Sequence, residues 1–247
     1  MPEIQFGNTT IEYTLNIVKN DGQFPSDEIS IVVEWLDGVT VTTTDRLTIN
    51  EIESMLYKKA KWILDKWEAV NEIVEAPPHR EFISGEKLPY CGKNYKIKVL
   101  QNNKLNSISI NFLQGKFLIE TPFNPKTTEH NEQVKERIIK WYITHAQSKA
   151  IDRANYYSQL MGVTPKSIKV KTQHMRWGTC TPSGNIYLNW RLFMAPISVI
   201  DYVIVHELAH LKYPNHSKDY WSFVQTILPN YEEKKDWLRK NGPLLTL

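Results

Sequence analysis

Three histidines fall within eleven residues in the last fifth of the chain, at a spacing that suits a metal ion. His206 and His210 are four residues apart, and His216 follows six residues later. Residues four apart on an α-helix share one face, so His206 and His210 can direct imidazole nitrogens at a single ion. Glu207 stands between them, where its carboxylate can take a proton from a water on that ion. The pattern indicates a metal-dependent hydrolase with Glu207 as general base.

His216 can reach the same ion only if the helix ends soon after His210. A continuing helix would turn by about 600° over six residues and carry His216 to nearly the opposite face. Pro214 disfavours the helical conformation at Tyr213, and Asn215 is a common turn residue. Three neutral imidazoles with one open position are typical of catalytic zinc, whereas structural zinc has four protein ligands. We therefore expect one Zn²⁺ per chain.

The plainer alternative is a partly buried amphipathic helix whose histidines line one face without binding a metal. The five-residue HExxH pattern recurs by chance in many proteins, so it does not decide between the two. The third histidine favours the metal site.

The composition is that of a globular protein without a strong electrostatic bias. The chain has 247 residues, 41% of them hydrophobic, and 30 basic and 27 acidic residues give a formal net charge of +3. This near balance neither requires nor excludes nucleic acid as a partner. No apolar run is long enough to span a membrane, and the first residues do not resemble a signal peptide. We expect a cytoplasmic protein without a membrane partner, whose two cysteines, Cys91 and Cys180, are free thiols.

The first half of the chain is rich in strand patterns. Apolar residues alternate from 11 to 17, and again in a hairpin over 29–43 whose turn is Asp37–Gly38 after Trp35. A capping box at Thr48 and Glu51 then opens a long amphipathic helix, with an apolar stripe from Ile52 to Val74, that ends before a Pro-Pro pair at 77–78. At least three short strands follow between 95 and 119. No internal repeat is apparent.

The second half is mainly helical. A helix is expected over 127–161 with Gly162 just after its end, followed by a short β-region over 168–188. The helix of the histidine motif begins near Pro196, and two helices follow His216. We therefore expect an α+β protein with two domains, a β-rich domain over 1–125 and a metal-binding domain over 126–247.

Three motifs in the second half resemble those of the YgjP-like metallopeptidase family, a relative of the SprT-like and other minimal zincins. They are HELAHLKYPNHSKDYW at 206–221, RWGTC at 176–180 and GNIYLNWRLFMAP at 184–196. Residues 85–99 resemble the N-terminal half of the family more weakly, so the similarity covers most of the chain.

The resemblance implies a zincin-like C-terminal domain in which His206, His210 and His216 bind zinc and Glu207 is the catalytic carboxylate. It also implies that the RWGTC strand lies close to the metal site. Thr179 stands where the family more often has serine, a change that keeps the hydroxyl group.

Peptide-bond hydrolysis is the leading hypothesis for the reaction, with a peptide or protein as substrate. Such a reaction also needs donors that bind the substrate or stabilise the oxyanion of the transition state. Arg176, Trp177, Tyr213 and Tyr220 are candidates for that role.

Two other functions stay open. The same site would suit phosphoanhydride hydrolysis of a nucleoside triphosphate, an activity also associated with the family, with Arg176 and Arg191 neutralising phosphate charge, although the chain has no Walker-type loop. Alternatively, the chain would be a metal-stabilised adaptor that binds a protein or nucleic acid through its first half, where Trp and Lys interleave over 57–67.

Overall fold

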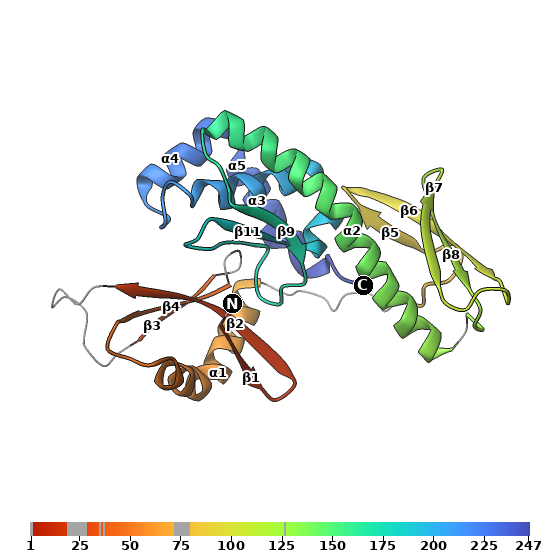
Figure 1. The fold of residues 1–247 in the computed structure, drawn as a ribbon, viewed down its shortest axis with the longest axis horizontal. Coiled ribbons are helices and arrows are strands. Elements are labelled where there is room, and N and C mark those ends of the chain that lie inside the picture. The colour runs from red at the N-terminus through yellow and green to blue at the C-terminus, as the bar shows by residue number, and fades with distance from the viewer. Residues whose placement is uncertain (1, 19–28, 35, 37, 72–79, 126) are drawn as a thin grey trace. The chain divides into compact units, whose positions relative to one another are not determined.

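The computed structural model describes residues 2–18, 29–34, 36, 38–71, 80–125 and 127–247. These residues form five α-helices, two short 3-10 helices and eleven strands in three sheets, so the protein is of the mixed α+β class (Figure 1). Within the same residues, no helix is both long and apolar enough to cross a bilayer.

The chain divides into two compact units. The first comprises Met1–Glu75 and Gln173–Thr179, and the second comprises Ala76–Thr172 and Cys180–Leu247. Residues on both sides of position 125 thus belong to the second unit, so these units do not follow the expected boundary. The division into domains at 1–125 and 126–247 stays a prediction.

The first unit is a four-stranded sheet followed by a helix. Its strands are β1 (Glu3–Phe6), β2 (Thr9–Val18), β3 (Ser30–Glu34) and β4 (Gly38–Thr44), in the order β1-β2-β4-β3, and its helix is α1 (Ile49–Asn71). The central pair β2 and β4 is parallel, and both outer pairs are antiparallel. The predicted capping box opens α1, because the Thr48 amide donates to Glu51 Oε2 at 2.8 Å and the Glu51 amide donates to Thr48 Oγ at 3.4 Å.

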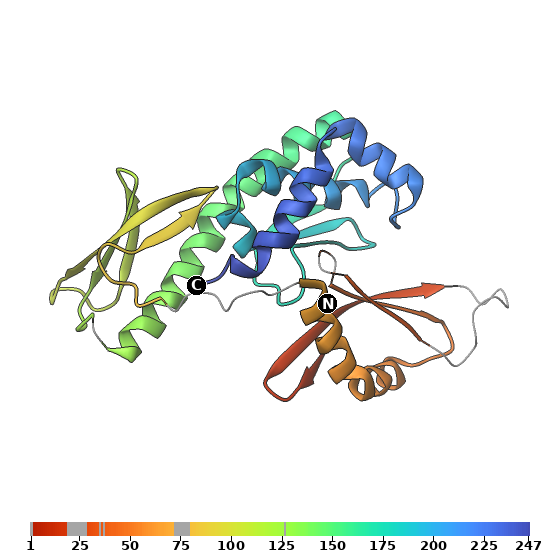
Figure 2. The same ribbon diagram turned by 180° about the vertical axis from the view of Figure 1, so that it is seen from behind.

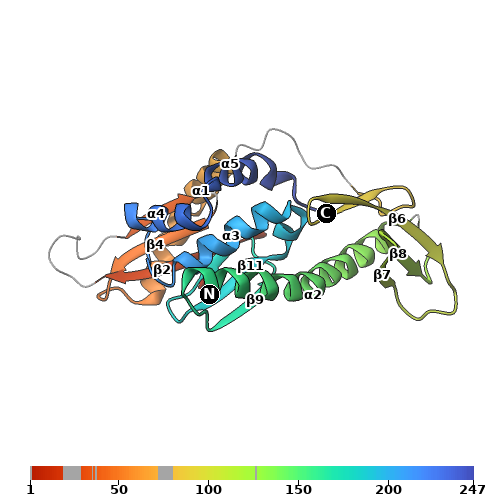
Figure 3. The same cartoon turned by 90° about the horizontal axis from the view of Figure 1, so that it is seen from above.

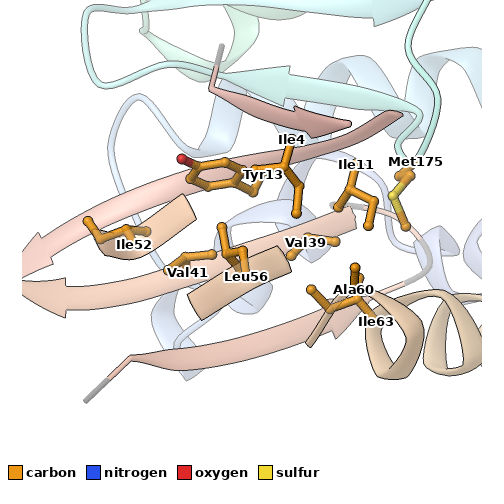
Figure 4. Close-up of a cluster of buried hydrophobic side chains, with 10 residues drawn as sticks. All are labelled: Ile4, Ile11, Tyr13, Val39, Val41, Ile52, Leu56, Ala60, Ile63 and Met175. Atoms are coloured by element: carbon orange, nitrogen blue, oxygen red, sulfur yellow. The ribbon is translucent and has the colours of Figure 1, made fainter. Parts of the chain in front are cut away.

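The core of the first unit lies between one face of this sheet and α1. Strand side chains alternate between the two faces of the sheet, so every second residue points into the core. The buried cluster consists of Ile4, Ile11, Tyr13, Val39, Val41, Ile52, Leu56, Ala60, Ile63 and Met175 (Figure 4). The predicted helical stripe is thus confirmed from Ile52 to Ile63, whereas Val74 lies outside the described residues.

The predicted hairpin of β3 and β4 forms, but its turn is longer than expected. Gly38 is the first residue of β4 and pairs with Glu34, so three residues separate the two strands. The prediction of a two-residue turn at Asp37–Gly38 is therefore wrong. Gly38 has a φ of 75°, and a Cβ atom there would lie 2.6 Å from the carbonyl oxygen of Met175. Only glycine fits both constraints. Trp35 and Asp37 themselves lie outside the described residues.

The second unit begins with a sheet of the same design. Its strands are β5 (Lys87–Tyr90), β6 (Lys93–Gln101), β7 (Ser109–Leu113) and β8 (Lys116–Thr121), in the order β5-β6-β8-β7, and α2 (Thr128–Met161) follows. Again the central pair is parallel and the outer pairs are antiparallel. Figures 1 and 2 show this sheet in yellow beside the first half of α2 in green. Four strands and a helix therefore occur twice with one topology, a repeat that the sequence pattern does not show.

Helix α2 has the ends that the sequence predicts. The side chain of Thr127 accepts a hydrogen bond from the His130 amide, and Gly162 follows the helix with a left-handed φ of 64°. Inside the helix, Val134, Ile138 and Trp141 are buried, as expected for the apolar stripe.

His130 makes the stability of the second unit sensitive to acid. It is 1% exposed, its Nδ1 lies 3.2 Å from Thr121 Oγ, and burial lowers its pKa. The unfolded chain, with a histidine pKa of about 6.5, binds a proton more readily than the folded chain, so stability falls as pH drops below that value toward the lower folded pKa. We expect urea unfolding to show a smaller loss of stability between neutral and acidic pH in His130→Gln than in the wild type. His145→Gln, which changes an exposed histidine of α2, is expected to behave like the wild type.

The rest of the second unit carries the histidine motif. A three-stranded sheet has the order β10-β11-β9, with β9 at Ser167–Lys171, β10 at Gly178–Cys180 and β11 at Asn185–Asn189. The helical elements that follow are η1 (Trp190–Met194), α3 (Ile197–Ala209), α4 (Lys218–Ile227), α5 (Tyr231–Asn241) and η2 (Gly242–Leu244). Helix α3 packs beside α2 (Figure 3).

Candidate metal centre

Helix α3 is the interior helix of the second unit. Every residue from Val199 to Ala209 is buried, because the helix is apolar on nearly all sides and is covered by its neighbours. His206 and Glu207 are among the few polar residues of this helix, and they are 0% and 1% exposed. The sequence therefore places an imidazole and a carboxylate where bulk water does not reach.

The chain reverses direction directly after this helix, as the position of His216 requires. Helix α3 ends at Ala209, and the amide of Tyr213 donates to the Ala209 carbonyl at 2.9 Å. Ser217 then caps α4 by accepting a hydrogen bond from the Tyr220 amide. The predicted end of the helix is confirmed, although it comes before the Tyr213–Pro214 step, because a tight turn already closes the helix.

The three predicted histidines come together in space. One nitrogen from each of His206, His210 and His216 lies within 4.8 Å of the other two, and Nε2 of His206 is 3.2 Å from Nε2 of His216. In a tetrahedral zinc site with Zn–N bonds of about 2.05 Å, ligand nitrogens are about 3.3 Å apart. The donor set and the distance between His206 and His216 therefore fit a zinc ion.

Neighbouring groups orient two of these rings. Nδ1 of His210 lies 3.3 Å from the carbonyl oxygen of Tyr213, a contact that leaves Nε2 for a metal, as is usual for histidine ligands. The His216 ring stacks on Trp221, with centroids 5.4 Å apart and planes at 24°, and Trp221 stacks in turn on Tyr231. Side chains of α4 and α5 thus form one stack with the His216 ring and fix its position. Sequence reasoning did not single out Trp221, although it ends the motif HSKDYW.

Tyr220 and Tyr213 lie at this centre, and both side chains contact other groups of the protein. The Tyr220 side chain is fully buried and its hydroxyl donates to the carbonyl oxygen of His206 at 3.0 Å. The Tyr213 ring packs against Phe223 at 5.6 Å. These contacts favour a packing role, and a role in binding the transition state stays a prediction for both tyrosines.

Arg176 and Trp177 belong to the first unit. The Arg176 side chain is 2% exposed and donates to Thr14 Oγ at 2.8 Å and to the carbonyl oxygen of Glu12 at 3.0 Å. The amide of Trp177 donates to the carbonyl oxygen of Leu36 at 3.1 Å. These bonds hold the segment on the first unit, and the substrate roles of both residues stay predictions.

The last residue of RWGTC, Cys180, lies in the second unit near the motif helix. Burial and, to a lesser extent, the negative charge of Glu207 raise the pKa of its thiol to about 12, so the thiol stays protonated at neutral pH. Both cysteines are free, as the sequence predicts. The position of the preceding residues of RWGTC relative to the histidines stays a prediction.

A bidentate ion pair that the sequence does not reveal fixes α3 on α2. Arg153 Nε donates to Asp201 Oδ1 and Arg153 Nη2 donates to Asp201 Oδ2, both at 2.6 Å. Asp201 lies five residues before His206, and its side chain is 9% exposed. Two parallel hydrogen bonds fix the orientation of the two side chains and also strengthen the ion pair. The pair therefore sets how α3 lies against α2.

Removing one partner of this pair is expected to destabilise the protein. Arg153→Leu leaves the Asp201 carboxylate nearly buried without its cation, which costs about 3 kcal/mol in such settings. The free energy of unfolding from urea titration is the measurement, and Arg137→Leu, an exposed arginine of the same helix, is the matched control. The double change Arg153→Leu/Asp201→Leu should recover part of the loss. Equal stability of the two arginine variants would contradict the prediction.

Comparison with known proteins places these residues in a family. The chain matches the model described as YgjP-like metallopeptidase domain over residues 27–241. No curated protein matches the chain. Among solved structures, it is similar to the crystal structure of the metallopeptidase zymogen of Pyrococcus abyssi abylysin, with 22% identity and a TM-score of 0.34 over 36% of this chain and 90% of the other. Since the family model spans most of the sequence, from the first sheet to the helices after His216, the chain belongs to the YgjP-like metallopeptidase family.

Proposed function

We propose that this protein is a zinc-dependent peptidase in which His206, His210 and His216 hold the ion and Glu207 is the general base. The observation that carries the proposal is the convergence of three imidazoles from α3 and the loop after it, with two nitrogens already 3.2 Å apart. Membership of a metallopeptidase family supports a metal cofactor and a peptide or protein substrate.

The histidines and Glu207 would have different roles in the reaction. The histidines fix the ion, and when bound it supplies Lewis-acid chemistry, which activates water and polarises a carbonyl group. Glu207 accepts the proton of the attacking water at its carboxylate and delivers it to the leaving amine. Because Glu207 sits in the part of α3 that is buried, from Val199 to Ala209, its carboxylate is held in place before the substrate arrives.

A comparison of two substrate classes tests this function. Zinc-loaded and chelator-treated protein would be incubated with an unfolded protein, followed by mass spectrometry of the fragments, and separately with nucleoside triphosphates, followed by pyrophosphate detection. We expect peptide cleavage with the zinc-loaded protein alone. Hydrolysis of the triphosphates without peptide cleavage would contradict the proposal and favour phosphoanhydride chemistry, and no turnover of either class would favour an adaptor.

A further inference from the structure

The two four-stranded sheets can be compared residue by residue, because their registers agree. Glu3 pairs with Glu12 in the first sheet, and Lys87 pairs with Lys96 at the corresponding place in the second. In the parallel pair, Tyr13 faces Val39 in the first sheet and Ile97 faces Phe117 in the second. All four of these core residues are fully or almost fully buried. Counting from them, Glu12, Thr14 and Gly38 correspond to Lys96, Lys98 and Lys116.

In the first sheet, a peptide segment occupies these positions. Glu12 and Thr14 alternate with the core residues Ile11 and Tyr13, so their side chains lie on the face away from α1. The segment Gln173–Thr179 belongs to the same unit. Its Arg176 side chain donates hydrogen bonds to Thr14 Oγ and to the Glu12 carbonyl oxygen. The Nε atom of Arg176 lies 3.2 Å from the position that a Cβ atom on Gly38 would take. Glu12 is 7% exposed. A cation of a docked segment thus bonds the backbone of β2 at Glu12 and the neighbouring Thr14 side chain.

In the second sheet, the same positions are open and the charge is reversed. Lys87, Lys96, Lys98 and Lys116 are all exposed, and none has an ion-pair partner among the described residues. Lys96 pairs with Lys87 on one side and with Lys116 on the other, an arrangement in which like charges directly opposite each other repel. Residues 80–125 contain seven basic and three acidic residues, a net charge of +4, against +3 for the whole chain. Three adjacent lysines across three strands form an uncompensated cationic row.

We propose that this lysine face, defined by Lys87, Lys96, Lys98 and Lys116, binds an acidic peptide segment of a partner protein. The segment would lie where Gln173–Thr179 lies on the first sheet and would offer carboxylates to the lysines, whereas the segment on the first sheet offers the cation Arg176.

Exposed leucines on the same face favour a peptide over nucleic acid. Leu113 pairs with Lys116 and is 57% exposed, and Leu100 follows Lys98 by two residues on β6 and is 40% exposed. Exposed leucines can bury apolar surface against the apolar side chains of a peptide, which is favourable. A phosphodiester backbone offers them little apolar surface, because proteins bind it through charged and polar groups. The proposal does not depend on the metal centre.

Binding of labelled peptides to the full-length protein tests this inference. The probe is a short fluorescent peptide in which Glu and Leu alternate, and its affinity is measured by fluorescence anisotropy. We expect Lys96→Glu/Lys116→Glu to bind it about tenfold more weakly or worse than the wild type. Lys135→Glu/Lys140→Glu, which reverses two exposed lysines of α2, changes the net charge equally and is expected to stay within about twofold.

Further outcomes decide the inference. Circular dichroism checks folding, and Lys96→Gln/Lys116→Gln replaces the charge reversal if that variant does not fold. An equal loss of affinity in the two charge-reversal variants, or no binding of the peptide to the wild type, would overturn the proposal. So would tighter binding of a short nucleic acid duplex that is lost in Lys96→Glu/Lys116→Glu, because the face would then be a nucleic acid site.

Discussion

Glu207→Gln is expected to lower kcat for peptide hydrolysis by about 10³-fold, within the range found for loss of a general acid–base group. Glutamine has nearly the same shape as glutamate, so it fits the buried position, which is 1% exposed. It cannot accept the proton of the attacking water. The three histidines are unchanged, and zinc content should therefore stay at one ion per chain.

The measurement pairs kcat with zinc analysis of the same preparation. Glu132→Gln, an exposed glutamate of α2, is the matched control and should keep the wild-type kcat. If Glu207→Gln retained more than a tenth of the activity, the general base would have to be sought elsewhere. Loss of zinc together with activity would instead show that the carboxylate supports the metal site.

Replacing His216 with alanine should weaken zinc binding by at least about 100-fold. Loss of a residue that only orients a ligand costs about 10- to 100-fold, and loss of the ligand itself should cost more. His206 on α3 and His210 directly after its end are unchanged, so two imidazoles would still face the site. Competition with a chromogenic chelator gives the affinity.

His145→Ala provides the comparison for this experiment. His145 is exposed on α2, and its Nδ1 lies 2.8 Å from the Trp141 carbonyl of its own helix. We expect wild-type zinc affinity in this variant. An unchanged affinity in His216→Ala would contradict the three-histidine site and leave a site built on His206 and His210.

The sequence predicts the local parts of this protein well. The capping box at Thr48 and the glycine after α2 at Gly162 both depend on residues within four positions, and each occurs in the structure. The histidine centre is local in the same way, because residues 206–216 form only the end of one helix and the turn that follows it. Such features are set by helix periodicity and turn chemistry, which a sequence displays directly.

The long-range arrangement could not be predicted in this way. Alternation tells which face of a strand is buried but not which strand is its neighbour, so the parallel pairs β2–β4 and β6–β8 left no mark in the pattern. The segment Gln173–Thr179 joins the first unit although the whole stretch Ala76–Thr172 of the second unit lies between them in the chain. The partners Arg153 and Asp201 are 48 positions apart. The repeat was hidden because its equivalent surface positions differ, with Glu12 in one copy and Lys96 in the other.

Helix α2 is a single rod with 34 residues, which gives it a length of about 51 Å. Its beginning contacts the sheet of β7 and its neighbours, and it also contacts β9 and α3. A continuous hydrogen-bonded helix cannot melt at one end without exposing apolar surface along the adjoining layers. Amide hydrogens of β8 and of α3 should therefore exchange with deuterium through one shared opening event, so that a destabilising change such as Arg153→Leu accelerates both to a similar degree.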